Sequence, residues 1–294
     1  MTDKLAPQFN DFSASAQPDL MTDAEYAAAY QAMAQGFLEG RQEKEKPSLL
    51  YVTGLPGAGK SSTVRNALHD PAFAHHLVIN FDDLRVYHPR YREHVKNDPV
   101  NAAARIDKAV EGLIGWLCEE AARRKADVIL DDAAMGAEMT GIVLAPFEKA
   151  GYDIDAVVMA VPDRIARQSV HLRFEKDYAA AKSGAAALPR WVNSEEQANA
   201  PAALFETVET LANDRHIGSL MLINREGRVL YPAPAHAVLQ DAGRIVKAEL
   251  VRDLTPREIA AYQDNAETIA RLMNARTGAQ KPAHGNRPSG RAPS

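Results

Sequence analysis

The sequence predicts an α/β protein in which helices cover both faces of a mostly parallel central sheet of about five strands. Two observations support this prediction: short apolar runs recur along the chain, and segments with helical spacing separate them. Alternation of this kind is typical of parallel sheets, because parallel neighbours need long crossover connections. The predicted strands are residues 48–53, 77–80, 127–131, 154–161 and 219–223.

Helical extensions are predicted on either side of this sheet unit, which we place at residues 46–235. Residues 1–20 are polar and rich in small residues, so we expect them to be disordered. An alanine-rich helix and a charged connector are predicted over residues 21–45. Beyond the main unit we expect C-terminal helices at 236–276 and a disordered tail at 277–294.

The longest predicted helix covers residues 101–125 and carries one apolar stripe, formed by Ile106, Val110, Leu113, Leu117 and Ala121. The stripe indicates a helix that packs on the sheet. Near the C-terminus, Thr255 before Pro256 is a plausible N-cap followed by a first helical residue. The segment NREG at 224–227 reads as a turn, with a short apolar run after it.

Composition narrows the class of protein. The chain has 294 residues, and its 34 basic and 39 acidic residues give a net charge of −5. This balance argues against nucleic-acid binding through a broad basic surface. Cys118 is the only cysteine, so no intrachain disulfide forms and a cytoplasmic protein is expected. We expect neither a signal peptide nor a membrane span, since no apolar stretch is long enough.

Residues 54–61, GLPGAGKS, match the phosphate-loop pattern G-x-x-x-x-G-K-[ST] between a predicted strand and a predicted helix. Glycines let backbone N–H groups surround phosphate oxygens, Lys60 reaches the β- and γ-phosphates, and Ser61 ligates Mg²⁺. A glycine-rich turn with a solvated lysine is the alternative, but it requires neither Lys nor Ser. We therefore predict a site for ATP or GTP with Mg²⁺, formed by Gly54, Pro56, Gly57, Ala58, Gly59, Lys60, Ser61 and Ser62.

Two acidic pairs follow predicted strands, where ligands bind in open α/β sheets. Asp82 or Asp83 could accept the proton of a substrate hydroxyl, or could cap the helix that follows; residue types leave both readings open. Asp131 and Asp132 end an apolar run and could hold Mg²⁺ through water or face a substrate.

Phosphoryl transfer also needs cations on the migrating phosphate. One segment supplies several candidates, and the position of each in the sequence does not choose among them because a solvated surface cation is the commoner case. These candidates are Arg167, Arg173, Lys176, Lys182 and Arg190.

Six pieces in order and spacing resemble the zeta toxin family, the kinase halves of epsilon–zeta toxin–antitoxin systems. They are the phosphate loop, FDDLRVYHPRY, VVMAVP, LRFE, RWV and LINREGRVLY, and the likeness covers about residues 46–235. The resemblance implies a P-loop kinase fold. It also implies transfer of the γ-phosphate of a purine triphosphate to the 3′-hydroxyl of the amino sugar of UDP-N-acetylglucosamine, which interferes with cell-wall synthesis.

The same resemblance assigns roles to individual residues. Lys60 matches the phosphate-loop lysine, and Asp82 matches the catalytic base in the family pattern D-x-D-x-F-R. Arg85 ends that pattern and, with Asp82 and Asp131, is expected to contact the acceptor. The two arginines that stabilise the phosphate correspond to Arg173 and Arg190.

The chain departs from the family in three places. Asn80 replaces the first acid of D-x-D, and residues 131–135 read DDAAM where the family has E-G-T-x-R, a segment that grips the nucleotide sugar. A family histidine is replaced by Gln197 or Asn199. The phosphoryl-transfer residues are thus kept, whereas the acceptor segment is rewritten.

Other functions remain open at this point. The acceptor could be NAD, a free nucleotide or a nucleic-acid end, or the protein could be a nucleotide-dependent switch that controls a partner. The resemblance implies an epsilon-type antitoxin that blocks the triphosphate site. The N-terminal helix could act in the same way in cis, or could simply pack as part of the structure.

Overall fold

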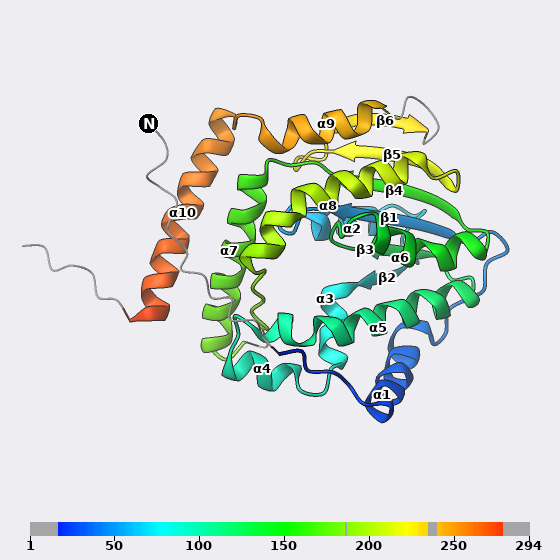
Figure 1. Ribbon diagram of the computed structural model, residues 1–294, viewed down its shortest axis with the longest axis horizontal. Coiled ribbons are helices and arrows are strands. Elements are labelled where there is room, and N and C mark those ends of the chain that lie inside the picture. Colours follow the sequence, from blue (N-terminus) through cyan, green and yellow to red (C-terminus); the bar gives the residue numbers. More distant parts are fainter. Residues whose placement is uncertain (1–16, 186, 235–239, 279–294) are drawn as a thin grey trace, which may run out of the picture.

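A computed structural model describes residues 17–185, 187–234 and 240–278 of the chain. Its central sheet has six strands in the order β2-β3-β1-β4-β5-β6 (Figure 1), and the first five in this order are parallel. The predicted α/β fold with a mostly parallel sheet is therefore confirmed. The strands are β1 (Ser48–Gly54), β2 (Leu77–Asn80), β3 (Val128–Asp131), β4 (Asp153–Met159), β5 (Ile217–Ile223) and β6 (Val229–Pro234).

The sixth strand is one more than expected. β6 pairs with β5 in antiparallel orientation, because the turn between them is too short for a parallel crossover. Within the turn, the Asn224 side chain accepts hydrogen bonds from the backbone N–H groups of Glu226 and Arg228, at 3.2 and 2.8 Å. The apolar run after the predicted turn thus forms the edge strand β6.

Helices lie on both faces of the sheet. Alternate residues of β1 point to opposite faces: Leu49 and Tyr51 join the larger core, and Leu50 and Val52 join a smaller one with Val64 of α2. The larger core also contains buried residues of α5, α6 and α8. The helices are α1 (Asp23–Met33), α2 (Lys60–Leu68), α3 (Phe81–Leu84), α4 (Tyr91–Asn97), α5 (Ala102–Arg123), α6 (Ala137–Lys149), α7 (Asp163–Lys182), α8 (Ser194–Asn213), α9 (Gln240–Val251) and α10 (Pro256–Thr277).

The N-terminal helix α1 packs on α5. Tyr30 stacks on Trp116 with ring centroids 4.6 Å apart, and the hydroxyl of Tyr26 donates to the carbonyl of Ala109 at 3.2 Å. Before the helix, Asp19 forms ion pairs with Arg90 at 2.8 Å and with His94 at 2.7 Å. Residues 17–20 of the segment expected to be disordered are thus held against α4, and residues 1–16 lie outside the described residues.

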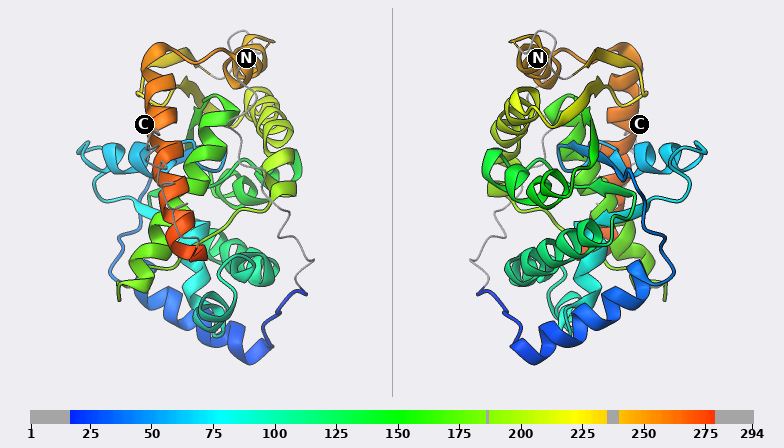
Figure 2. Two further views of the ribbon diagram at one scale, coloured as in Figure 1. Left: turned by 90° about the vertical axis from the view of Figure 1, so that its left-hand side faces the viewer. Right: turned by 90° about the vertical axis from the view of Figure 1, so that its right-hand side faces the viewer.

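At the C-terminus, α10 runs along the outside of α7 (Figure 2). Thr255 caps α10 as predicted, in a capping box with Glu258. Near the other end, Arg276 donates to the carboxylate of Glu175, which is 1% exposed, at 2.9 Å. The expected tail lies outside the description from residue 279 onward, as do residues 235–239.

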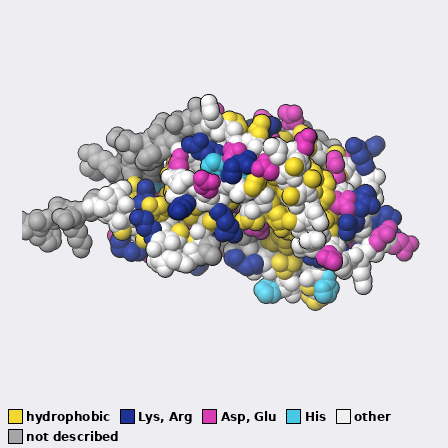
Figure 3. All heavy atoms as spheres, turned by 90° about the horizontal axis from the view of Figure 1, so that it is seen from below, with side chains coloured by type: hydrophobic (Ala, Val, Ile, Leu, Met, Phe, Trp, Pro, Cys, Tyr) yellow, Lys and Arg dark blue, Asp and Glu magenta, His cyan; other side chains and the backbone are white. Residues whose placement is uncertain are grey.

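Charged side chains of both signs lie on the face of the molecule drawn in Figure 3. Figure 3 shows Lys and Arg side chains lying among Asp and Glu side chains on the face that it draws, rather than gathered in one basic area. In the described part of the chain, no helix combines the length and the apolar character needed to cross a bilayer.

Candidate active site

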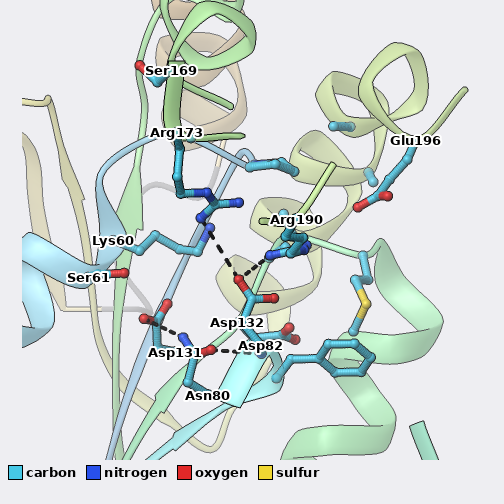
Figure 4. A pocket seen from close by; sticks show the side chains of 18 of the residues that line it. Lys60, Ser61, Asn80, Asp82, Asp131, Asp132, Ser169, Arg173, Arg190 and Glu196 are labelled. Atoms are coloured by element: carbon cyan, nitrogen blue, oxygen red, sulfur yellow. Dashed lines mark hydrogen bonds and ion pairs between the residues drawn. The ribbon is translucent and has the colours of Figure 1, made fainter. Parts of the chain in front are cut away.

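A cavity of about 590 Å³ opens at the carboxyl ends of the parallel strands, as expected for an open α/β sheet (Figure 4). The phosphate loop, α3, α5, α7 and α8 surround it. Its polar lining is formed by Lys60, Ser61, Asn80, Asp82, Arg85, Asp107, Glu111, Asp131, Asp132, Ser169, Arg173, Arg190, Glu196, Asn199 and Arg225.

The phosphate loop joins β1 to α2 and lies against α7. Gly57 has φ +81°, and a Cβ at this position would come within 2.2 Å of the carbonyl oxygen of Ala166. Glycine is required here for both reasons. Gly59, with φ +108°, is the N-cap of α2, so the positive end of that helix faces the cavity.

The eight residues predicted to hold phosphate divide into two groups. Pro56, Gly57, Gly59, Lys60 and Ser61 line the cavity. Gly54, Ala58 and Ser62 complete the loop without lining the cavity: the carbonyl of Gly54 accepts from Lys60, and the hydroxyl of Ser62 accepts from Arg65.

The Lys60 ammonium folds back on its own loop. Its Nζ donates to the carbonyl oxygens of Gly54 and Leu55 at 3.1 and 3.2 Å. Burial lowers the pKa of Lys60 below its usual value, and the nearby carboxylates of Asp131 and Asp82 oppose this shift. An anionic phosphate in the cavity would offer this ammonium a stronger partner than two carbonyl groups.

The Asp82 carboxylate is bound on both sides by arginines. Arg85 donates to Oδ1 and Arg190 to Oδ2, and Nη1 of Arg173 lies 3.9 Å from Oδ2. Burial alone would raise the pKa of Asp82, but the three guanidinium charges outweigh it and hold the pKa well below its usual range. Asp82 is therefore ionised at neutral pH, as an acceptor of a proton must be.

Arg85 links the carboxylate of Asp82 to that of Asp107. It is 2% exposed, and its Nε and Nη2 donate to Oδ1 of Asp107 at 2.9 and 2.7 Å. Burial lowers the pKa of Arg85, but the charges of Asp82 and Asp107 outweigh burial and raise it overall. Arg85 lines the cavity, as its predicted role in acceptor binding requires, but much of its donor capacity is taken by these two carboxylates.

The N-cap of α3 is Asn80 rather than one of the two aspartates that follow it. Its Oδ1 accepts from the backbone N–H of Asp82 at 2.8 Å, so Asn80 is the N-cap of α3 and Asp82 is not. Its Nδ2 donates to Oδ2 of Asp131 at 2.8 Å. One amide thus caps the helix that carries Asp82 and fixes the carboxylate at the end of β3.

Asp131 ends β3 and Asp132 follows it, and the two are 4% and 3% exposed. Burial raises the pKa of Asp131 and raises that of Asp132 to about 7, while the Lys60 ammonium opposes both shifts. Oδ1 of Asp131 is buried without a hydrogen-bond partner, and both Asp131 and Ser61 line the cavity. Carboxylate and hydroxyl oxygens are ligands that Mg²⁺ prefers, so the residues present fit this ion.

Two of the five candidate cations line the cavity, and three do not. Arg173, on α7, and Arg190, in the loop before α8, both line it, whereas Arg167 binds Asp163 at 2.7 Å. Arg167, Lys176 and Lys182 are not among its lining residues.

Five polar lining residues were not singled out from the sequence: Asp107, Glu111, Ser169, Glu196 and Arg225. Arg225 donates to the hydroxyl of Ser169 at 2.8 Å beside the phosphate loop, and Asp107 and Glu111 come from α5. Arg225 lies in LINREGRVLY, one of the six pieces that carried the resemblance, so that motif was a usable signal. The two acids sit beside the apolar stripe of a long helix, where nothing local distinguishes them from solvated residues.

Comparison with known proteins shows which family the chain is similar to. The zeta toxin family model matches residues 35–235. The toxin zeta of Streptococcus pyogenes is 26% identical over 263 residues, covering 86% of this chain and 85% of that protein. The toxin zeta of Enterococcus hirae is 26% identical over 247 residues, covering 80% of this chain and 79% of that protein.

Among solved structures, the PezAT chromosomal toxin–antitoxin system of Streptococcus pneumoniae contains a chain of the same fold. It superposes with a TM-score of 0.70 at 14% identity, covering 86% of this chain and 98% of that chain. The family model spans more than half of the sequence. The chain therefore belongs to the zeta toxin family and is a P-loop phosphotransferase.

Proposed function

We propose that the protein transfers the γ-phosphate of ATP or GTP to a hydroxyl of a small-molecule acceptor, with Asp82 as the general base. One observation carries this proposal: Arg85, Arg173 and Arg190 converge on the carboxylate of Asp82 inside the cavity that the phosphate loop lines. A switch protein that only hydrolyses a triphosphate has no need of an acceptor base.

In the proposed reaction the hydroxyl oxygen of the acceptor attacks the γ-phosphorus. A new O–P bond forms, the bond between the γ-phosphorus and the β–γ bridging oxygen breaks, and the nucleoside diphosphate leaves. Asp82 takes the proton of the hydroxyl. Lys60, Arg173 and Arg190 bind the phosphate oxygens, on which charge is distributed during transfer. Mg²⁺, held by Ser61 and by Asp131 directly or through water, would neutralise charge on the β- and γ-phosphates.

Two acceptor classes follow from the sequence. The family resemblance implies a nucleotide sugar such as UDP-N-acetylglucosamine, phosphorylated on its 3′-hydroxyl, with interference with cell-wall synthesis as the result. The departure at residues 131–135 favours another small acceptor. A nucleic-acid end is disfavoured by the net charge of −5 and by the mixed charge on the face drawn in Figure 3.

The likeness to the PezAT system supports an antitoxin partner of the epsilon type. A cis-acting N-terminal helix has less support, since α1 packs on α5 and no residue of 17–45 is among those that line the cavity. Met33 in α1 is fully buried, so this helix contributes to the core.

Asp82→Asn tests the proposal. The variant keeps the size of the side chain and removes its capacity to accept a proton. We expect transfer to fall by about 10²–10⁴-fold with triphosphate affinity kept. Asp83→Asn is the matched control, because Asp83 is exposed and is not among the residues lining the main cavity. Near wild-type transfer by Asp82→Asn, measured with labelled ATP and GTP and a metabolite extract, would show that Asp82 is not the base.

A further inference from the structure

The two ends of the cavity differ in chemistry. Figure 4 shows Lys60 and Ser61 on one side of Asp82 and Glu196 on the other. The first side is the triphosphate end. We call the other side the acceptor end; α5, the segment after β3 and the start of α8 form it. Its lining includes Asp107, Glu111, Asp132, Ala133, Met135 and Glu196.

The acceptor end is rich in carboxyl groups and poor in available cations. Among the described residues, the lining cations nearest to it are Arg85, Arg173 and Arg190, and all three already face the carboxylate of Asp82. Arg85 also binds Asp107, and Glu111 is paired with Lys108 outside the cavity lining. Asp132 is deeply buried, and Glu196 is exposed and forms no ion pair in the described part of the chain.

A diphosphate group would bind unfavourably at the acceptor end. It would bring further negative charge into a cavity that already holds a triphosphate, and like charges placed together without a cation between them oppose binding. The segment that would compensate offers none: Ala133 and Met135 line the cavity where the family pattern has Thr and Arg. Hydroxyl or ammonium groups, in contrast, would donate to the carboxylates.

We propose that the acceptor is a non-anionic alcohol rich in hydrogen-bond donors, such as a sugar or amino sugar, rather than a nucleoside diphosphate sugar. This inference rests on the proposed function and deepens it. The reaction is unchanged: the hydroxyl oxygen bonds to the γ-phosphorus, its proton passes to Asp82, and the nucleoside diphosphate leaves. Only the groups that hold the rest of the acceptor differ.

A panel of probes with labelled ATP and GTP tests the class of acceptor. The full chain is assayed with N-acetylglucosamine, glucosamine and kanamycin, and with the anionic UDP-N-acetylglucosamine and NAD. We expect kcat/KM for the best non-anionic probe to exceed that for either anionic probe by at least about tenfold, the scale on which one charged contact discriminates. A higher kcat/KM for UDP-N-acetylglucosamine or NAD would overturn the inference.

Binding gives a second test that does not depend on turnover. The affinity of UDP-N-acetylglucosamine is measured by calorimetry in the presence of Mg²⁺ and a non-hydrolysable ATP analogue. Met135→Arg supplies the missing cation, so we expect it to bind the nucleotide sugar about tenfold more tightly than the wild type. Met135→Leu, which keeps an apolar side chain, is the matched control. Equal affinities for wild type and Met135→Arg would contradict the inference.

The two proposals fail in different ways. If UDP-N-acetylglucosamine is the best substrate and Asp82→Asn abolishes its phosphorylation, the inference about the acceptor is wrong and the proposed function stands. If neither the panel nor a metabolite extract is phosphorylated and Asp82→Asn hydrolyses ATP like the wild type, the proposed function is wrong.

Discussion

Asp82 and Arg190 form a part-buried ion pair in the lining of the cavity, in which Nη1 of the arginine donates to Oδ2 of the carboxylate. Arg85 holds the other oxygen of the same carboxylate. In this arrangement the candidate base and a candidate phosphate-binding cation neutralise each other. A bound triphosphate would compete for Arg190 and Arg173, and release of these arginines would leave Asp82 a better proton acceptor.

The first prediction compares the kinetic roles of Arg190, which lies beside the base, and Arg225, which lies beside the phosphate loop. Arg190→Gln removes a charge next to Asp82, so we expect kcat to fall by about 10²–10³-fold with a smaller change in the KM for ATP. Arg225→Gln removes the donor that binds Ser169, and we expect mainly a higher KM. Steady-state kinetics at several ATP concentrations measure both. Equal losses of kcat in the two variants would refute this division of roles.

The second prediction concerns the contact between the phosphate loop and α7. In Gly57→Ala the new Cβ would lie 2.2 Å from the carbonyl oxygen of Ala166, at φ +81°. We expect the loop to be displaced and the affinity for a triphosphate to fall more than tenfold. Gly184→Ala is the control, because Gly184 has a similar φ of +88° but no atom within 4 Å of the added Cβ. Calorimetric titration should show unchanged affinity in the control.

The sheet and the phosphate loop could be predicted because their signals are local. Apolar runs bounded by helical segments marked the five parallel strands, and a complete motif marked Lys60 and Ser61. β6 gave a weaker signal because its sequence contains Pro232 and Pro234, which suit an edge strand. Its antiparallel pairing with β5 is evident only from the structure, in which the turn between the two strands is tight.

The site was predictable only in part. Asp82, Arg173 and Arg190 were named from the sequence, and the structure brings them together. Asp107 was not, because its contact with Arg85 depends on how α5 packs beside α3. The link between Asn80 and Asp131 joins two strand ends, and it requires that β2 and β3 be neighbours in register. Tertiary contacts of this kind leave no pattern in a single sequence.

The third prediction concerns that link. Asn80→Asp keeps the cap acceptor of α3 but replaces the amide donor, which lies 2.8 Å from Oδ2 of Asp131, with a second carboxylate oxygen. We expect the free energy of unfolding to fall by about 2 kcal/mol, since the donor is lost and two like charges meet. Added Mg²⁺ and nucleotide should reduce this loss. Asn66→Asp, at an exposed position on α2, should change stability by no more than about 0.5 kcal/mol.

Chemical denaturation with and without Mg²⁺ and an ATP analogue checks this third prediction. If Asn80→Asp were as stable as the wild type in the absence of ligand, the hydrogen bond between Asn80 and Asp131 would not contribute as the structure indicates.

The fourth prediction concerns the ion pair that fastens α10 to α7. Glu175 is 1% exposed; burial raises its pKa, but hydrogen bonds from His171 and Arg276 outweigh burial and lower it overall. A carboxyl group whose pKa is depressed by folding contributes stability above its usual pKa of 4.5, and this contribution is lost as the pH falls through the lowered value. Arg276→Met leaves the buried carboxylate without its guanidinium partner. We expect a loss of about 3 kcal/mol at pH 7.

The sign of the pH dependence distinguishes this explanation from a simple loss of packing. Without Arg276, burial should raise the pKa of Glu175, so the carboxyl group takes up a proton as the pH falls and the deficit relative to wild type shrinks between pH 7 and pH 5. Arg244→Met, which removes an exposed cation paired with Asp241 on α9, should cost no more than about 0.5 kcal/mol at either pH. A deficit in Arg276→Met that is the same at pH 7 and pH 5 in denaturant titrations would argue that the charge of Glu175 is not its cause.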